Sequence, residues 1–271
     1  MENTRPLDLS RVIRDLNETI LFASLELKNK PGALMSVLVP LAKLNVNVIG
    51  IHSDAVTSED YLEVSLFLDV RNSKIKSGDL KKVLEEQIRL LDVIKEVKVF
   101  DHLPHELDAD LYHFPLKVHE RRAVVFTEVV LRDLILGLRN TLEISAAKTI
   151  LWLQGKEIGK NLVEYYEKYY DAKSVKEKLA LFEIYSFSLG WGIVSFESIN
   201  EEEKEAKVRI YNSFECSLFS ESKQPESQLF RGILSGFFSK LFNTEIDAVE
   251  EECIAKGDAY CSFTLSPRKQ Q

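Results

Sequence analysis

The sequence predicts an α+β protein, in which a ferredoxin-like βαββαβ domain precedes a second domain of helices packed on an antiparallel sheet. Three observations predict this class. Between residues 19 and 101, segments with period-two apolar alternation are interleaved with segments of helical apolar spacing. Three long helical segments follow, and the last third of the chain consists mainly of strand patterns around one further helix. With 271 residues, 45% of them hydrophobic, the chain is long enough to build two cores.

Composition excludes several classes of protein. The formal net charge is −8 and no dense basic block occurs, so direct nucleic-acid binding is not expected. No apolar run approaches the ~18 residues of a membrane helix, and the first residues lack an apolar signal core. We therefore expect a cytoplasmic protein without a membrane segment. Three cysteines do not make the disulfide framework of a secreted domain.

The first domain is predicted element by element. Residues 19–27 alternate as a strand, and the Pro31-Gly32 turn begins a helix that carries leucines at helical spacing up to residue 44. Pro40 is expected to kink that helix. The remaining patterns predict strands over 46–56 and 61–70, a helix over 80–91 and a strand over 95–100.

This order, together with "LKNKPGALMSVLVPLAKLNVNVIGIHS", resembles the ACT domain, a small regulatory module. In that family a strand ends in Asn or Asp, a Pro-Gly turn opens an apolar helix, and an Asn opens the next strand. The resemblance implies that paired domains bind an amino-acid-like effector, here through Asn29, Gly32, Ala33, Leu34 and Asn47. A helix N-terminus behind a permissive turn suits a carboxylate. The alternative is that the Pro-Gly turn only starts a helix and the domain mediates dimer contacts.

The domain organisation predicted from these patterns has five parts. They are an N-terminal segment (1–18), the ACT-like domain (19–101), a linker (102–112), a second domain (113–267) and a tail (268–271). The polar stretch around the linker contains His102, His105 and His113, for which we expect a solvated position.

In the second domain, helices are predicted over 127–142, 144–172 and 174–190. The long middle helix is expected to break at Gly155 or Gly159. Strands over 191–199 and 206–219, a helix over 229–242 and a hairpin over 249–263 complete the domain.

Five stretches of this domain resemble the 4-vinyl reductase domain: "GKEIG", "GWG", "NS", "GILSGFFSKLF" and the closing pattern Glu-x-x-Cys-x-Ala-x-Gly-Asp-x-x-Cys-x-Phe. The resemblance covers about residues 113–266, and proteins that join this domain to an ACT domain are archaeal. It implies a fold similar to subunits of the vesicle-tethering TRAPP complex, dimerisation, and a small molecule held between helices and sheet near a structural zinc. Family members include effector domains of aromatic-responsive transcription activators and accessory proteins of bacteriochlorophyll synthesis.

The closing motif places Cys253 and Cys261 on the two arms of a hairpin. Zinc prefers four ligands drawn from thiolate, imidazole and carboxylate. Strand alternation places Glu251 on the face of Cys253, and Glu250 needs a bulge to reach it; the family resemblance selects Glu250.

In zinc-bearing relatives a further cysteine lies 23 residues before the glutamate, and this chain has Ser227 there. Cys216 is the one remaining thiol that could replace it. Three interpretations stay open: a zinc held by Glu250, Cys253, Cys261 and Cys216, a Cys253–Cys261 disulfide, or free thiols.

No nucleophile elbow, Walker loop or Gly-x-Gly-x-x-Gly pattern is present, so we predict no enzyme activity. The aromatic side chains of the second domain either fill a core or line a ligand chamber, in which case we expect contributions from Trp152, Tyr185, Trp191 and Tyr211.

The predicted function is therefore that of a homodimeric sensor of small molecules, one amino-acid-like and one hydrophobic, which acts on an unidentified protein partner. The alternatives are an accessory or reductase-type protein for a vinyl-bearing tetrapyrrole and a purely structural assembly module.

Overall fold

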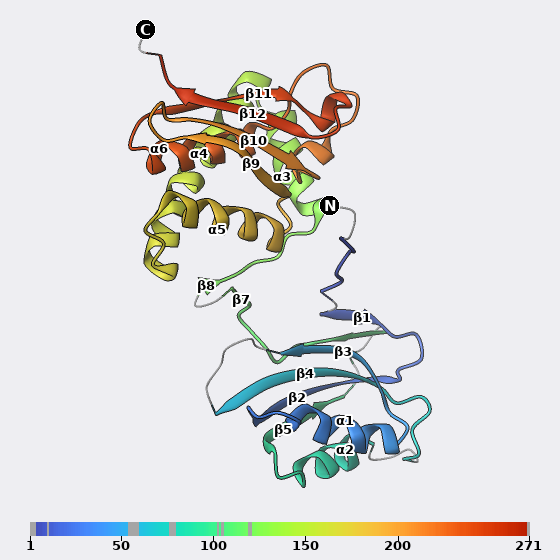
Figure 1. Ribbon diagram of the computed structural model, residues 1–271. Helices are drawn as coiled ribbons and strands as arrows, with labels where there is room; N and C mark the ends of the chain where they lie inside the picture. Colours follow the sequence, from blue (N-terminus) through green and yellow to red (C-terminus); the bar gives the residue numbers. More distant parts are fainter. Residues whose placement is uncertain are drawn as a thin grey trace. The chain divides into compact units, whose positions relative to one another are not determined.

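The protein is described by a computed structural model that covers residues 4–9, 11–53, 60–75, 80–101, 103, 106–118 and 121–269. The chain divides into two compact units, residues 1–124 (unit 1) and 125–271 (unit 2) (Figure 1). Each unit contains a four-stranded antiparallel sheet with helices, which confirms the mixed α+β class. Among the described residues, no helix combines the length and apolar composition needed to cross a membrane.

Unit 1 contains the predicted βαββαβ order, and its sheet has the strand order β3-β4-β2-β5. The elements are β2 (Ile20–Lys28), α1 (Ala33–Lys43), β3 (Asn47–Ser53), β4 (Tyr61–Asp69), α2 (Leu80–Arg89) and β5 (Ile94–Phe100). Alternate residues of β2, such as Leu25, point to one face and form a core with α1 and α2 (Figure 1). Pro40 lies inside α1, three residues before its last residue.

The other face of this sheet is partly covered by the segment predicted to be a linker. Strand β6 (Leu107–Ala109) pairs with β1 (Val12–Arg14) of the N-terminal segment. After β6, residues 110–113, here called the strap, lie on the sheet, and the His113 ring contacts Phe22 with a centroid distance of 6.0 Å. Thus His113 is not a solvated linker residue, while His102 and His105 lie outside the described residues. A two-stranded hairpin, β7 (Lys117–Val118) and β8 (Arg121–Arg122), follows the strap.

Unit 2 begins with three helices, α3 (Glu128–Thr141), α4 (Ile144–Tyr170) and α5 (Val175–Ser188). Its sheet has the strand order β11-β12-β10-β9. The remaining elements are β9 (Ile193–Asn200), β10 (Glu205–Tyr211), η1 (Cys216–Leu218), α6 (Gln228–Leu241), β11 (Ile246–Glu252), η2 (Ile254–Lys256) and β12 (Cys261–Pro267). The strand predicted over 206–219 is wrong beyond Tyr211, because Cys216 lies in a short 3₁₀ turn.

The predicted break in the long helix is also wrong, since α4 is continuous through Gly155 and Gly159. These glycines face Gly232 and Gly236 of α6. A Cβ atom on any of the four would lie closer than 3.0 Å to a backbone carbonyl oxygen of the other helix. The glycines therefore allow backbone contact between α4 and α6, and this need for space, not a need for flexibility, explains their presence.

This crossing predicts opposite effects for two glycine-to-alanine substitutions. Gly159→Ala forces a methyl group against the backbone of α6, so we expect the free energy of unfolding to fall by about 1–3 kcal/mol. The matched control is Gly137→Ala in α3, where a Cβ would meet nothing within 4 Å. Because alanine is the better helix former, this control should gain up to about 1 kcal/mol. Denaturant unfolding of both variants measures the difference, and equal midpoints would contradict the backbone contact.

Candidate metal centre

The three cysteines of the chain and Glu250 converge in unit 2. One ligand atom from each of Cys216, Glu250, Cys253 and Cys261 lies within 4.8 Å of all the others. The Sγ atoms of Cys216 and Cys253 are 3.4 Å apart, and Cys216 Sγ is 3.9 Å from Glu250 Oε1. All three cysteines are fully buried and none forms a disulfide.

A bulge in the final hairpin brings Glu250 to the thiols. The register between β11 and β12 shifts between Glu250 and Glu252, so the alternation of side chains is interrupted there. Glu251, which strand alternation favours, instead points to the exposed side and accepts a hydrogen bond from Thr264 Oγ1 at 2.8 Å. The geometry therefore agrees with Glu250 as the carboxylate of the site.

The loop between the two hairpin cysteines is fixed by Asp258 and Gly257. The backbone N–H of Cys253 donates to Asp258 Oδ2 at 2.8 Å. Gly257 has a φ of +97°, a left-handed conformation that a residue with a Cβ rarely adopts. These two residues explain the Gly-Asp pair of the motif, since they set the direction in which Cys253 leaves the strand.

The N-terminus of α6 closes the site from the other side. The backbone N–H of Ser227 donates to Glu250 Oε2 at 3.1 Å, and its hydroxyl donates to Glu250 Oε1 at 2.7 Å. The same hydroxyl lies 2.7 Å from Cys216 Sγ. Cys216 thus lies beside the position where relatives supply a cysteine.

A buried carboxylate that the sequence reasoning missed holds Cys216 in this place. Glu215 is fully buried and accepts backbone N–H groups of Leu229 and Phe230, both at 2.8 Å, so it caps α6. Burial raises the pKa of Glu215 to about 7, against the opposing effect of these backbone hydrogen bonds. The available signal was an acidic residue within the otherwise uncharged stretch "SFECS".

The electrostatics of the cluster favour a bound cation. Burial raises the pKa of Glu250 to about 8, although the Ser227 hydroxyl acts in the opposite direction. Hydrogen bonds from the other two thiols, first that of Cys216, lower the pKa of Cys253. A buried thiolate beside a buried carboxyl group is costly without a compensating positive charge.

The donor set fits a tetrahedral metal ion such as zinc. Zinc–sulfur bonds of about 2.3 Å in a tetrahedron place two sulfurs about 3.8 Å apart, close to the 3.4 Å between Cys216 and Cys253. Four protein donors would complete the coordination shell and leave no open position, which is the arrangement of structural sites. The residues that would hold the ion are Cys216, Glu250, Cys253 and Cys261.

The aromatic residues predicted to line a ligand chamber lie in different places. Trp152 on α4 lies beneath the Lys156 ammonium group, 5.2 Å from its ring centre. Trp191 packs at the edge of the unit 2 core, and Tyr211 at the end of β10 contacts Tyr260 with a centroid distance of 5.4 Å. Tyr185 on α5 belongs to a cluster of tyrosines.

This tyrosine cluster is formed by Tyr165, Tyr166 and Tyr170 of α4 together with Tyr185. The hydroxyl groups of Tyr165 and Tyr170 both lie within hydrogen-bond distance of the Tyr185 hydroxyl. Tyr166 is fully buried, and its hydroxyl has no hydrogen-bond partner among the described residues. The sequence analysis named Tyr185 and omitted Tyr166, although the run "YYEKYY" marks the same place.

In unit 1, the predicted effector residues surround the start of α1. Gly32 precedes the helix with a φ of +82°, and Ala33 is buried against the core with Leu34 partly buried beside it. Asn29 follows β2 and its backbone N–H donates to Asp60. Asn47 is the first residue of β3 and is exposed.

Comparison with known proteins agrees with the second of the two resemblances. Residues 206–267 match the family model of the 4-vinyl reductase domain, so that resemblance is confirmed for this part of the chain. No match was found among curated proteins.

Several solved structures are similar to this chain. The phenol-responsive sensory domain of the transcription activator PoxR, solved with phenol, has 21% sequence identity and a TM-score of 0.50, covering 56% of this chain and 79% of that one. A vinyl-4-reductase family protein from Methanocaldococcus jannaschii has 18% identity and a TM-score of 0.33, covering 54% and 100%. An H-NOX protein from S. oneidensis has 11% identity and a TM-score of 0.38, covering 55% and 80%. At these identities the PoxR domain indicates a shared fold.

The metal centre predicts that a cysteine can be moved between two neighbouring positions. Cys216→Ser should lower the bound metal, measured by elemental analysis of purified protein, to a small fraction of the wild-type value. The double variant Cys216→Ser/Ser227→Cys should regain metal, because the two side chains lie 2.7 Å apart. Glu250→Gln should also lose metal, and its matched control, Glu251→Gln, should keep it. Equal metal content in the two glutamine variants would contradict the assignment of Glu250.

Proposed function

We propose that this protein is a non-enzymatic sensor of small molecules, in which unit 2 binds a small hydrophobic ligand and carries a structural zinc. The observation that carries the proposal is the fully buried Tyr166 hydroxyl, which the described residues leave without a hydrogen-bond partner. A buried donor without a partner costs about 1–3 kcal/mol. A ligand with a polar atom on an apolar body would remove that cost.

The surroundings of Tyr166 suit such a ligand. Its ring contacts Phe237 of α6 and Tyr185 of α5, with centroid distances of 6.3 and 5.4 Å. Aromatic walls with a few polar groups are typical of sites for small organic molecules. The PoxR sensory domain, which shares the fold, is responsive to phenol, and this supports a phenol-like ligand for the present chain.

The proposed zinc would act by joining segments, not by chemistry on a substrate. Its donors come from η1, from the end of β11 and from the start of β12. A closed set of four donors stabilises the fold to which it belongs and leaves no coordination position for a reactant. Zinc would thus fix the final hairpin against the N-terminus of α6, where Ser227 already contacts Glu250.

Unit 1 is proposed to act as an ACT-like regulatory domain for an amino-acid-like effector. Support comes from the βαββαβ order and from the left-handed Gly32 immediately before α1. A carboxylate at this helix N-terminus would be stabilised by the helix dipole. The expected contacts remain Asn29, Gly32, Ala33, Leu34 and Asn47.

We further propose that the protein is a homodimer through α3 and the residues just before it. The helix buries only Ile135 among its described residues, and the segment exposes an apolar stripe that continues along the helix. More than two-fifths of each member of the stripe is exposed: Val125, Phe126, Val129, Val130 and Leu134. Stripes of this kind are typical of surfaces covered by another chain, and a second copy is the commonest partner.

The sensing proposal predicts a specific behaviour of Tyr166→Phe. Without ligand, the variant should be as stable as the wild type or more stable by about 1 kcal/mol, since it loses a buried hydroxyl that lacks a partner. Phenol or 4-methylphenol should raise the unfolding temperature of the wild type and have a much smaller effect on the variant. Tyr169→Phe, a change of the same kind on a partly exposed neighbour, is the control and should respond like the wild type. An equal response of Tyr166→Phe and wild type would contradict the site.

The dimer proposal predicts that Leu134→Asp shifts the protein from dimer to monomer, because it places a charge on the apolar stripe. Sedimentation equilibrium measures this shift. Arg132→Asp, also exposed on α3 but on another face, should leave the dimer intact. A wild-type protein that is monomeric at micromolar concentration would refute the proposal.

A further inference from the structure

The sheet of unit 1 carries a row of three like charges on the face that α1 and α2 do not cover. Glu26 of β2 lies directly opposite Glu63 of β4 in the register, and on its other side directly opposite Glu96 of β5. Like charges in directly opposed positions destabilise a sheet. The row therefore needs either compensation within the protein or a cationic ligand.

The protein compensates this row only in part. Glu26 pairs with Lys95 at 2.8 Å, Glu96 with Lys98 at 2.7 Å, and Glu63 with the His113 ring at 2.9 Å. Each of these contacts uses the Oε1 atom of the glutamate. Within the described part of the chain, no contact occupies the Oε2 atoms, so three carboxylate oxygens stay available.

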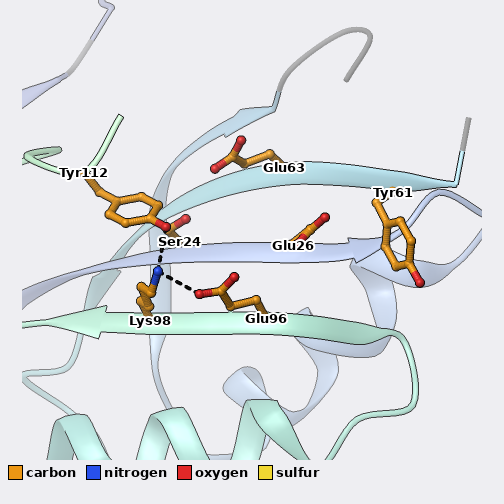
Figure 2. A pocket seen from close by; sticks show the side chains of 7 residues that line it. All are labelled: Ser24, Glu26, Tyr61, Glu63, Glu96, Lys98 and Tyr112. Atoms are coloured by element: carbon orange, nitrogen blue, oxygen red, sulfur yellow. Dashed lines mark hydrogen bonds and ion pairs between the residues drawn. The ribbon is translucent and has the colours of Figure 1, made fainter. Parts of the chain in front are cut away.

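These glutamates lie in a cavity of about 290 Å³ that the strap helps to form (Figure 2). Tyr112 of the strap stands at one end beside Ser24 and Lys98, and Tyr61 of β4 stands at the other end. The three glutamates lie between the two tyrosines on neighbouring strands. The volume is that of a small metabolite.

The cavity already shows how it holds an alkylammonium group. The Lys95 Nζ atom lies 4.4 Å from the centre of the Tyr61 ring while it pairs with Glu26. The Lys98 Nζ atom lies 4.6 Å from the centre of the Tyr112 ring while it pairs with Glu96. Each end thus combines a carboxylate with a tyrosine face, the combination that binds organic cations.

From this geometry we infer that the cavity binds a linear aliphatic diamine, with its two ammonium groups on the glutamate row and its carbon chain between the tyrosine rings. Adjacent strands are about 4.8 Å apart, so the outer glutamates Glu63 and Glu96 are separated by about two such spacings. Four- or five-carbon diamines place two charges within that span. A single ammonium group would neutralise only one member of the row, so a diamine is the better match. This site is separate from the predicted effector residues at the start of α1.

The test is calorimetric titration of the full-length protein with 1,4-diaminobutane at low ionic strength. We expect saturable binding of the diamine, at least tenfold weaker binding of 1-aminobutane, and no binding of 1,4-butanediol. Glu26→Gln, at the centre of the row, should weaken diamine binding about tenfold. The control Glu86→Gln removes the same charge from an exposed position of α2 and should leave binding unchanged.

Two outcomes would overturn the inference: absence of saturable diamine binding, or equal weakening by Glu26→Gln and Glu86→Gln, which would indicate only general attraction to an acidic protein. The unfolding temperature separates loss of the site from loss of the fold. Glu26→Gln removes a like-charge repulsion, so without diamine it should unfold no earlier than the wild type. If it does unfold earlier, Glu63→Gln takes its place, and unchanged binding in that folded variant would also overturn the inference.

Discussion

The crossing of α4 and α6 is the constraint on which unit 2 depends. Four glycines let the two backbones touch, and a Cβ atom at any of them would collide with a carbonyl oxygen. Because the helices approach so closely, α6 is enclosed along most of its length, with ten of its fourteen residues buried. The position of α6 in turn fixes where its first N–H groups lie. Those groups meet Glu215 and Glu250, so the same crossing determines where the metal donors converge.

A cation would complete an arrangement that the backbone has already prepared. Glu250 and Ser227 are joined by two hydrogen bonds, and Glu215 fixes the residue next to Cys216. Only the hairpin loop remains to be oriented, and Asp258 does this through the backbone of Cys253. Three buried thiols and a buried carboxyl group would repel one another if several were ionised, and a divalent ion converts this repulsion into attraction. The protein fold and the ion thus stabilise the same geometry.

The local elements were predictable from the sequence because their signals are local. Period-two alternation in β4 and helical spacing in α2 each follow from the residues of a single element. Contacts between distant elements were not predictable in this way. The glycines of α4 predicted a break because the sequence does not show that α6 requires their missing side chains. Strand alternation favoured Glu251, since nothing in the sequence marks the bulge that turns Glu250 toward the thiols. Cys216 could be named as a candidate only, because its distance from Cys253 depends on the fold.

The strap of unit 1 shows why side-chain order alone does not define chemistry. Ser24, His113 and Asp110 lie in the order of a nucleophile, a base and an orienting acid, with Ser24 Oγ 3.3 Å from Nε2 of His113 and Asp110 Oδ2 2.9 Å from its Nδ1. Glu63 Oε1, however, lies 2.9 Å from the same Nε2 atom, closer than the serine. A carboxylate only accepts hydrogen bonds, so a ring held between two carboxylates bonds both of them only with hydrogen on both nitrogens. Such a ring has no lone pair with which to take a proton from Ser24. The same contacts instead join the strap to β4, which places Tyr112 over the glutamate row and gives the cavity its second aromatic wall.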